Sequence, residues 1–118
     1  MQVTDTADSS VVEFLIVAAL ERYHASWDQL IQDWFDRDRC EKANHELNEI
    51  RKLAAALPRV SADIMELTMR HAQLLRARVK GEGAPHRRAA EVAALRRKHR
   101  AAIEAMRTKC MRLLGPTR

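Results

Sequence analysis

Three histidines are the residues of this chain whose type and placement could support chemistry. His24, His71 and His99 lie on or beside the apolar stripes of three expected helices. Counting residues along an up-and-down bundle brings them to similar heights, within about 10 Å of one another. Inward histidines on facing helices can hold a metal ion or a haem, whereas a buried histidine more often bonds to a carbonyl or hydroxyl group. We therefore predict no cofactor and keep the three histidines as the candidate metal ligands.

The acidic residues near histidines do not complete a catalytic pattern. Glu21 and His24 form a single Glu-x-x-His, whereas di-iron bundles use two copies with further carboxylates. Glu41 and His45 are one turn apart on a polar face. There is no Ser-His-Asp or Cys-His pairing in a readable spacing, no glycine-rich phosphate loop and no pair of carboxylates on an apolar face. We predict that the protein is not an enzyme.

Glycine and proline divide the chain that must position these residues. The breaks are Pro58, the 81–85 stretch and Gly115-Pro116. Ser10 and Glu13 have the spacing of a capping box, so the first helix is expected to begin at Ser10.

The apolar stripe reveals one more break, before Pro58. It steps by three and four residues up to Trp34 and again from Cys40, but the gap between these two is six residues where the repeat requires seven. We place a tight turn between Asp36 and Arg39, with Asp38 as a candidate cap. The prediction is an all-α, four-helix up-down-up-down bundle. Its helices cover roughly 10–36, 38–57, 58–80 and 85–114, with a flexible segment 1–9 and a tail 115–118.

Two further expectations follow from this topology. Residues beside the main stripe of the third helix, such as Met65 and Val79, widen its apolar face, so we expect this helix to be the most buried. Cys40 and Cys110 would lie more than ~30 Å apart, which is beyond the reach of a disulfide.

Met1 to Ser10 contain no basic residue, so no secretory signal is expected. The apolar run that follows is too short to span a bilayer, and we expect a cytoplasmic protein with free thiols.

The charge of the chain changes sign near its middle. Residues 1–56 carry six Lys/Arg against eleven Asp/Glu, a net of −5, and residues 57–118 carry fifteen against five, a net of +10, which together give the +5 of the chain. Such a split points to nucleic acid, to an acidic protein or to the other half of the chain as the partner. The sequence does not distinguish pairing within the chain from pairing between molecules.

The last helix carries a basic patch, which we define as Arg96, Arg97, Arg100 and Arg107. A row of arginines along one flank could follow phosphates. No aromatic residue occurs after Phe35, so base stacking from this half is excluded. The alternatives are a solvated helix face that pairs partly with the acidic helices, or steering toward an acidic protein.

The first helix carries more apolar surface than one contact face requires. Its start is apolar on nearly every side, and Phe14 and Leu15 point away from the main stripe. This surplus would suit a homodimer interface or a docking groove, although packing at the N-terminus would also cover it. We predict that Phe14, Leu15, Trp27 and Trp34 anchor a partner or a second copy.

A four-residue stretch adds a resemblance. Trp27-Asp28-Gln29-Leu30 resembles the Trp-Asp-x-Leu stretch of flagellar export chaperones of the helical-hairpin type. The resemblance implies a chaperone or adaptor role. We therefore expect a non-catalytic, chaperone-like adaptor or regulatory protein that binds another protein as a homodimer. Nucleic-acid binding without sequence specificity is the alternative, and a metal or haem bundle is the third reading.

Overall fold

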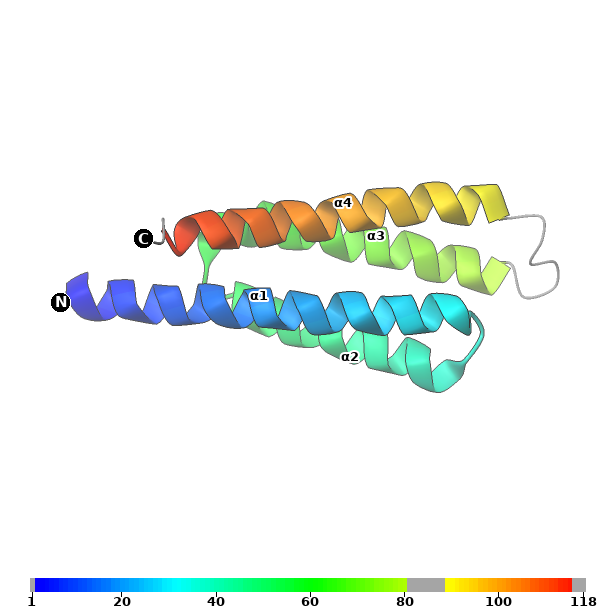
Figure 1. The fold of residues 1–118 in the computed structure, drawn as a ribbon, viewed down its shortest axis with the longest axis horizontal. Coiled ribbons are helices and arrows are strands. Elements are labelled where there is room, and N and C mark those ends of the chain that lie inside the picture. Colours follow the sequence, from blue (N-terminus) through cyan, green and yellow to red (C-terminus); the bar gives the residue numbers. More distant parts are fainter. Residues whose placement is uncertain (1, 81–88, 116–118) are drawn as a thin grey trace.

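The protein is a bundle of four α-helices that run alternately up and down (Figure 1). The computed structural model describes residues 2–80 and 89–115, and side chains from residue 11 onward within them. The helices are α1 (Gln2–Gln32), α2 (Arg37–Ala54), α3 (Ser61–Lys80) and α4 (Ala89–Leu113), with a short 3-10 turn η1 (Pro58–Val60) before α3. The described part contains no strand, so the predicted all-α four-helix bundle is confirmed.

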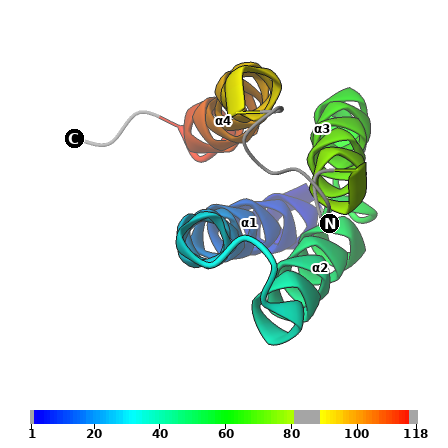
Figure 2. The same ribbon diagram turned by 90° about the vertical axis from the view of Figure 1, so that its right-hand side faces the viewer.

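The four helices stand at the corners of a rod that measures 57 × 24 × 23 Å. Viewed from the end, α1 lies beside α2 and α4, and α3 lies beside the same two helices on the opposite corner (Figure 2). The core runs along the axis between them. Its largest fully buried side chains include Ile16, Leu20 and Tyr23 of α1, Ile50 of α2, Leu67 and Leu74 of α3, and Met106 of α4.

The first helix begins earlier than the sequence indicated. It starts at Gln2 and passes through Ser10, so the predicted start at Ser10 is wrong, and residues 2–9 are helical. No glycine or proline precedes Pro58, so nothing in the sequence stops the helix at Ser10. The side chain of Ser10 lies outside the described side chains. The first turns of α1 project beyond the ends of the other helices (Figure 1).

A turn does separate the first two helices, but it occupies residues 33–36 and not the predicted stretch from Asp36 to Arg39, and its cap is Asp36 and not Asp38. The Asp36 carboxylate accepts a hydrogen bond from the backbone N–H of Arg39 at 2.9 Å, which satisfies a free donor of α2. Arginines also satisfy carbonyls in the last turn of α1 and in the turn that follows it. The Arg39 guanidinium donates to the Gln29 carbonyl at 2.8 Å, and Arg78 of α3 donates to the Trp34 carbonyl at 2.8 Å.

The remaining boundaries follow glycine and proline. Pro58 begins η1 and delays α3 to Ser61, because proline suits the first position of a helical turn. Gly115 adopts a φ of 89°, and its N–H donates to the Arg112 carbonyl at 2.9 Å, which closes α4 as predicted. The predicted start of the last helix at 85 and the end of the tail, 116–118, lie outside the described residues.

Both cysteines are free, as the topology predicted, and they differ in burial. Cys110 is buried, and burial together with nearby Glu13 and Asp63 raises the pKa of its thiol to about 11 against the opposing influence of Lys109. Cys40 is half-buried.

We expect iodoacetamide to modify Cys40 first in the native protein. Labelling of Cys110 should be slower by at least about 100-fold, because only the thiolate reacts and burial suppresses it. A time course followed by peptide mass spectrometry measures both rates. In denaturant the two rates should become similar, whereas equal rates in the native protein would contradict the buried position of Cys110.

Candidate functional site

The histidines of α3 and α4 meet at the hydroxyl group of Tyr23 on α1. The Tyr23 oxygen lies 2.7 Å from Nδ1 of His71 and 2.7 Å from Nε2 of His99, and all three side chains are buried. The second ring nitrogen of His71 lies 2.7 Å from Oδ1 of Asn44 on α2. Each helix therefore contributes one residue to a single chain of hydrogen bonds, which we call the tyrosine–histidine cluster: Tyr23, Asn44, His71 and His99.

The hydrogen bonds fix the protons of this cluster relative to one another. With Asn44 accepting, Nε2–H of His71 donates to it, and Nδ1 of His71 accepts the Tyr23 proton. Nε2–H of His99 then donates to the Tyr23 oxygen. Rotating the Asn44 amide reverses every donor and acceptor together. Both arrangements satisfy all the bonded atoms with neutral imidazoles, so the cluster needs no charge.

Trp27 closes the cluster from the next turn of α1. Its ring packs edge-on against His71 and His99, with centroids 5.2 and 4.9 Å apart. Trp27 is only 3% exposed, and its indole nitrogen has no hydrogen-bond partner in the described part of the chain. The predicted role of Trp27 as a partner anchor is therefore wrong, because this ring is core.

Burial holds the cluster in its neutral form. Desolvation lowers the pKa of His71 to about 4. It also lowers the pKa of His99 to about 3, with further contributions from the nearby charges of His71, His24, Arg96 and Arg100. Burial raises the pKa of Tyr23 well above its usual range. None of these groups is poised to exchange a proton near neutral pH, which does not suit acid–base catalysis.

The arrangement does not favour a metal. His24 is separate from the cluster and half-exposed, with Nδ1 3.8 Å from the carboxylate of Asp28. The nitrogens of His71 and His99 that could face an ion both bond to Tyr23 instead. No group of three or more His, Cys, Asp or Glu side chains in the described residues could hold a metal ion. His99 also borders a pocket beside Arg96 and Arg100, but its volume is about 10 Å³, too small for a ligand.

The basic patch is partly used inside the molecule. Arg96 lies 3.9 Å from Asp28 and Arg107 lies 3.7 Å from Glu21, so the basic α4 pairs with the acidic α1. Exposed ion pairs of this kind contribute about 0–1 kcal/mol each. Arg97 and Arg100 are exposed, and the described part of the chain offers neither an ion pair. Part of the basic charge of α4 is therefore paired with the acidic charge of α1 in the same chain.

The N-terminal half of α1 carries an apolar surface that the bundle leaves open. We call it the α1 surface: Val11, Phe14 and Leu15. Phe14 is 63% and Leu15 42% exposed, and Val11 is also exposed. Ile16, almost opposite Phe14 on the helix, is fully buried in the core. Trp34, the remaining predicted anchor, is half-buried and packs against the core.

A second apolar surface lies where sequence reasoning expected burial. Met65 is 71% and Met69 45% exposed on α3, and Val79 is also exposed, so α3 is not the most buried helix. The methionines line an open groove of about 740 Å³ between α3 and the end of α2. We call this the α2/α3 groove. Its apolar walls include Ala54, Ala55, Ile64, Met65, Met69 and Ala72.

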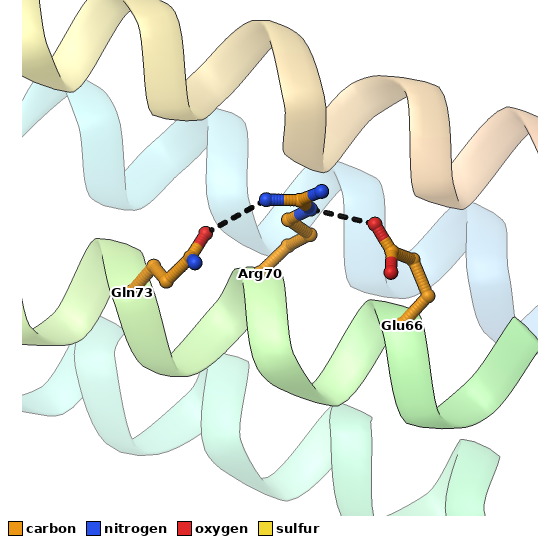
Figure 3. A network of polar contacts seen from close by, with 3 residues as sticks. All are labelled: Glu66, Arg70 and Gln73. Carbon is orange, nitrogen blue, oxygen red and sulfur yellow. Dashed lines mark hydrogen bonds and ion pairs between the residues drawn. The ribbon is translucent and has the colours of Figure 1, made fainter.

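The other side of α3 is polar. Arg70 donates to the Glu66 carboxylate at 2.7 Å and to the Gln73 side-chain oxygen at 3.2 Å (Figure 3). Figure 3 shows the Arg70 side chain pointing toward α4. Between α3 and α4, Lys109 lies 2.7 Å from Asp63, an ion pair whose angles are poor for a hydrogen bond. The exposed methionines of α3 therefore face the groove with α2, whereas exposed Val79 lies outside it.

Comparisons with known proteins found nothing similar to this chain. Neither protein-family models, nor curated proteins, nor solved structures give a match to this chain. No helix in the described part of the chain combines the length and apolar character needed to cross a membrane.

Proposed function

We propose that this protein is a non-catalytic, chaperone-like adaptor that binds another protein and forms a homodimer through α1. The observation that carries the proposal is the exposure of Phe14 and Leu15, which both neighbour exposed Val11 one turn earlier on the helix. A contiguous apolar surface of this kind is normally covered by a partner. The buried, neutral tyrosine–histidine cluster supports the non-catalytic part, because no described solvent-filled pocket of useful size reaches it.

A two-fold axis across α1 is the simplest geometry for self-association. Two copies of the α1 surface would then meet in an isologous contact, with each Phe14 covered by the other α1 helix. Exposed Arg97 and Arg100 on α4 would remain free to steer an acidic partner.

The nucleic-acid alternative depends on a row of free cations along α4. Ion pairs at Arg96 and Arg107 shorten that row, and the remaining cations favour an acidic protein as readily as phosphates.

We expect Phe14→Asp combined with Leu15→Asp to convert a dimer into a monomer. Burying two carboxylates per subunit without partners should weaken self-association by about 100-fold or more. Light scattering on a size-exclusion column, at low and high salt, measures the mass of each variant. Phe35→Asp is the matched control, since Phe35 is also an exposed aromatic residue but follows α1 at its far end. A double variant that keeps the wild-type dimer mass would refute the interface.

A further inference from the structure

We propose that the α2/α3 groove is a binding site for an amphipathic helix of a partner protein, about three turns long, whose apolar stripe is edged by a carboxylate. The inference rests on the proposed function, since it identifies where the adaptor would hold its partner and what that partner presents. It concerns a different surface from the α1 surface, so each can be tested without the other.

The length of the groove matches a short helix. Its lining residues on α3 run from Ser61 to Ala72, which spans about 17 Å at 1.5 Å per residue. A helix of about eleven residues has the same length and offers apolar side chains at positions i, i+3 or i+4, and i+7. The 740 Å³ of open space falls in the range of well-formed binding sites.

The walls have the chemistry of a surface that accepts helices. Ala54, Ala55 and Ala72 are small, so they permit an incoming helix to approach closely. Met65 and Met69 are flexible and polarizable, and they can adjust to side chains of different shapes. Leaving both methionines in water costs free energy that a covering helix would recover.

Arg51 supplies the charge complementarity. It is the charged residue among those that line the groove, it is exposed, and it forms no ion pair or side-chain hydrogen bond within the described part of the chain. A carboxylate at the edge of the incoming stripe would meet this guanidinium, and an ammonium group at the same place would be repelled.

A second copy of this chain fits the groove less well than a different protein. Insertion of α1 from one copy into the groove of the next would be heterologous and would extend into open chains unless a ring closed. An isologous α1 dimer leaves both grooves open.

Methionine methyl NMR offers a direct test, because the described methionines report on different surfaces. Met65 and Met69 line the groove, Met106 is in the core, and Met111 is exposed on the last turn of α4. The probe is a capped synthetic peptide of about 18 residues, long enough to populate a helix, with a leucine stripe and a glutamate at each end of it. We expect saturable shifts of the Met65 and Met69 methyl groups, with Met106 and Met111 unchanged.

Variants and matched peptides sharpen the result. Arg51→Glu should weaken the glutamate peptide about three- to tenfold and strengthen a peptide with lysines in the same places. Met65→Glu with Met69→Glu should weaken binding at least about tenfold while the fold survives, because both side chains are exposed. Binding of a peptide with the same composition but no stripe, or equal shifts at Met111, would show non-specific adhesion and overturn the proposal.

Two other outcomes would also decide whether the groove binds a partner helix. Absence of shifts at Met65 and Met69 would overturn the groove as a helix site. Shifts that grow with protein concentration in the absence of peptide would show that a second copy occupies it. The Phe14→Asp, Leu15→Asp variant should titrate like the wild type. Loss of the dimer without loss of the methionine shifts would therefore separate a failure of the α1 interface from a failure of the groove.

Discussion

Tyr23→Phe is expected to lower the free energy of unfolding by about 2–4 kcal/mol, although it removes a single oxygen atom. The ring would still fill its space, but Nδ1 of His71 and Nε2 of His99 would both lose their partner. Each buried polar atom left without a hydrogen bond costs about 1–3 kcal/mol. The melting temperature should fall by roughly 8–20 °C, measured by circular dichroism with urea titrations for the free energy.

Thr68→Val is the matched control, because it also removes a hydroxyl group from the bundle. The Thr68 hydroxyl donates only to the Ile64 carbonyl one turn earlier, at 2.7 Å. That carbonyl keeps its place in the helix, so we expect a change within about 0.5 kcal/mol. If Tyr23→Phe were as mild as Thr68→Val, the cluster would contribute little to stability.

The fold should lose stability in mild acid. His71 and His99 have pKa values of about 4 and about 3 in the folded protein, against about 6.5 in the unfolded chain. Above pH 6.5 both states are neutral and stability is complete. As the pH falls below 6.5 the unfolded chain binds two protons that the folded protein rejects, so stability declines by up to about 5 kcal/mol by pH 4.5. This loss is comparable to the whole stability of many domains.

Urea unfolding at pH 7.5, 6.5, 5.5 and 4.5 measures this slope, and the first three points lie above the range in which carboxylates titrate. His71→Gln and His99→Gln should each remove about half of the pH dependence, although both variants start from a lower stability at pH 7.5. His45→Gln, an exposed position on α2, should leave the slope unchanged. A wild-type free energy that stays constant from pH 7.5 to pH 4.5 would contradict neutral, buried imidazoles.

Sequence reasoning succeeded where a local pattern determines the structure. The phase change between Trp34 and Cys40 located the first turn, because a stripe out of register cannot continue on one helix. Gly115 closed α4 for an equally local reason, since its φ suits glycine alone. The start of α1 was missed because a capping pattern at Ser10 and Glu13 does not stop a helix when the preceding residues also favour one.

The candidate site depended on orientation, which one sequence does not determine. The similar heights of His71 and His99 were expected, but the sequence analysis did not single out their common partner Tyr23. A tyrosine in the same stripe, at the same height as two inward histidines, was the available signal. Asn44 carried no signal, because only the packing of α2 against α3 brings it to His71.

The apolar surfaces show the same limit. A wide apolar face on α3 was interpreted as burial, whereas its second stripe, which includes Met65, is exposed along the groove. Trp27 was assigned to a partner surface by residue type, and the structure places it in the core. An apolar pattern indicates which residues are covered from water, but it does not indicate whether the same chain or a partner covers them.

The tyrosine–histidine cluster also restricts how the four helices can align along their length. Apolar stripes repeat every three or four residues, so a helix displaced by one turn, about 5.4 Å, would still present leucines and alanines to its neighbours. The cluster contains one residue from each helix, and its bonds join positions 48 and 76 residues apart in the chain. Displacement of any one helix would strand polar atoms in the core. Four polar residues thereby select one longitudinal alignment among several that the apolar residues alone would accept.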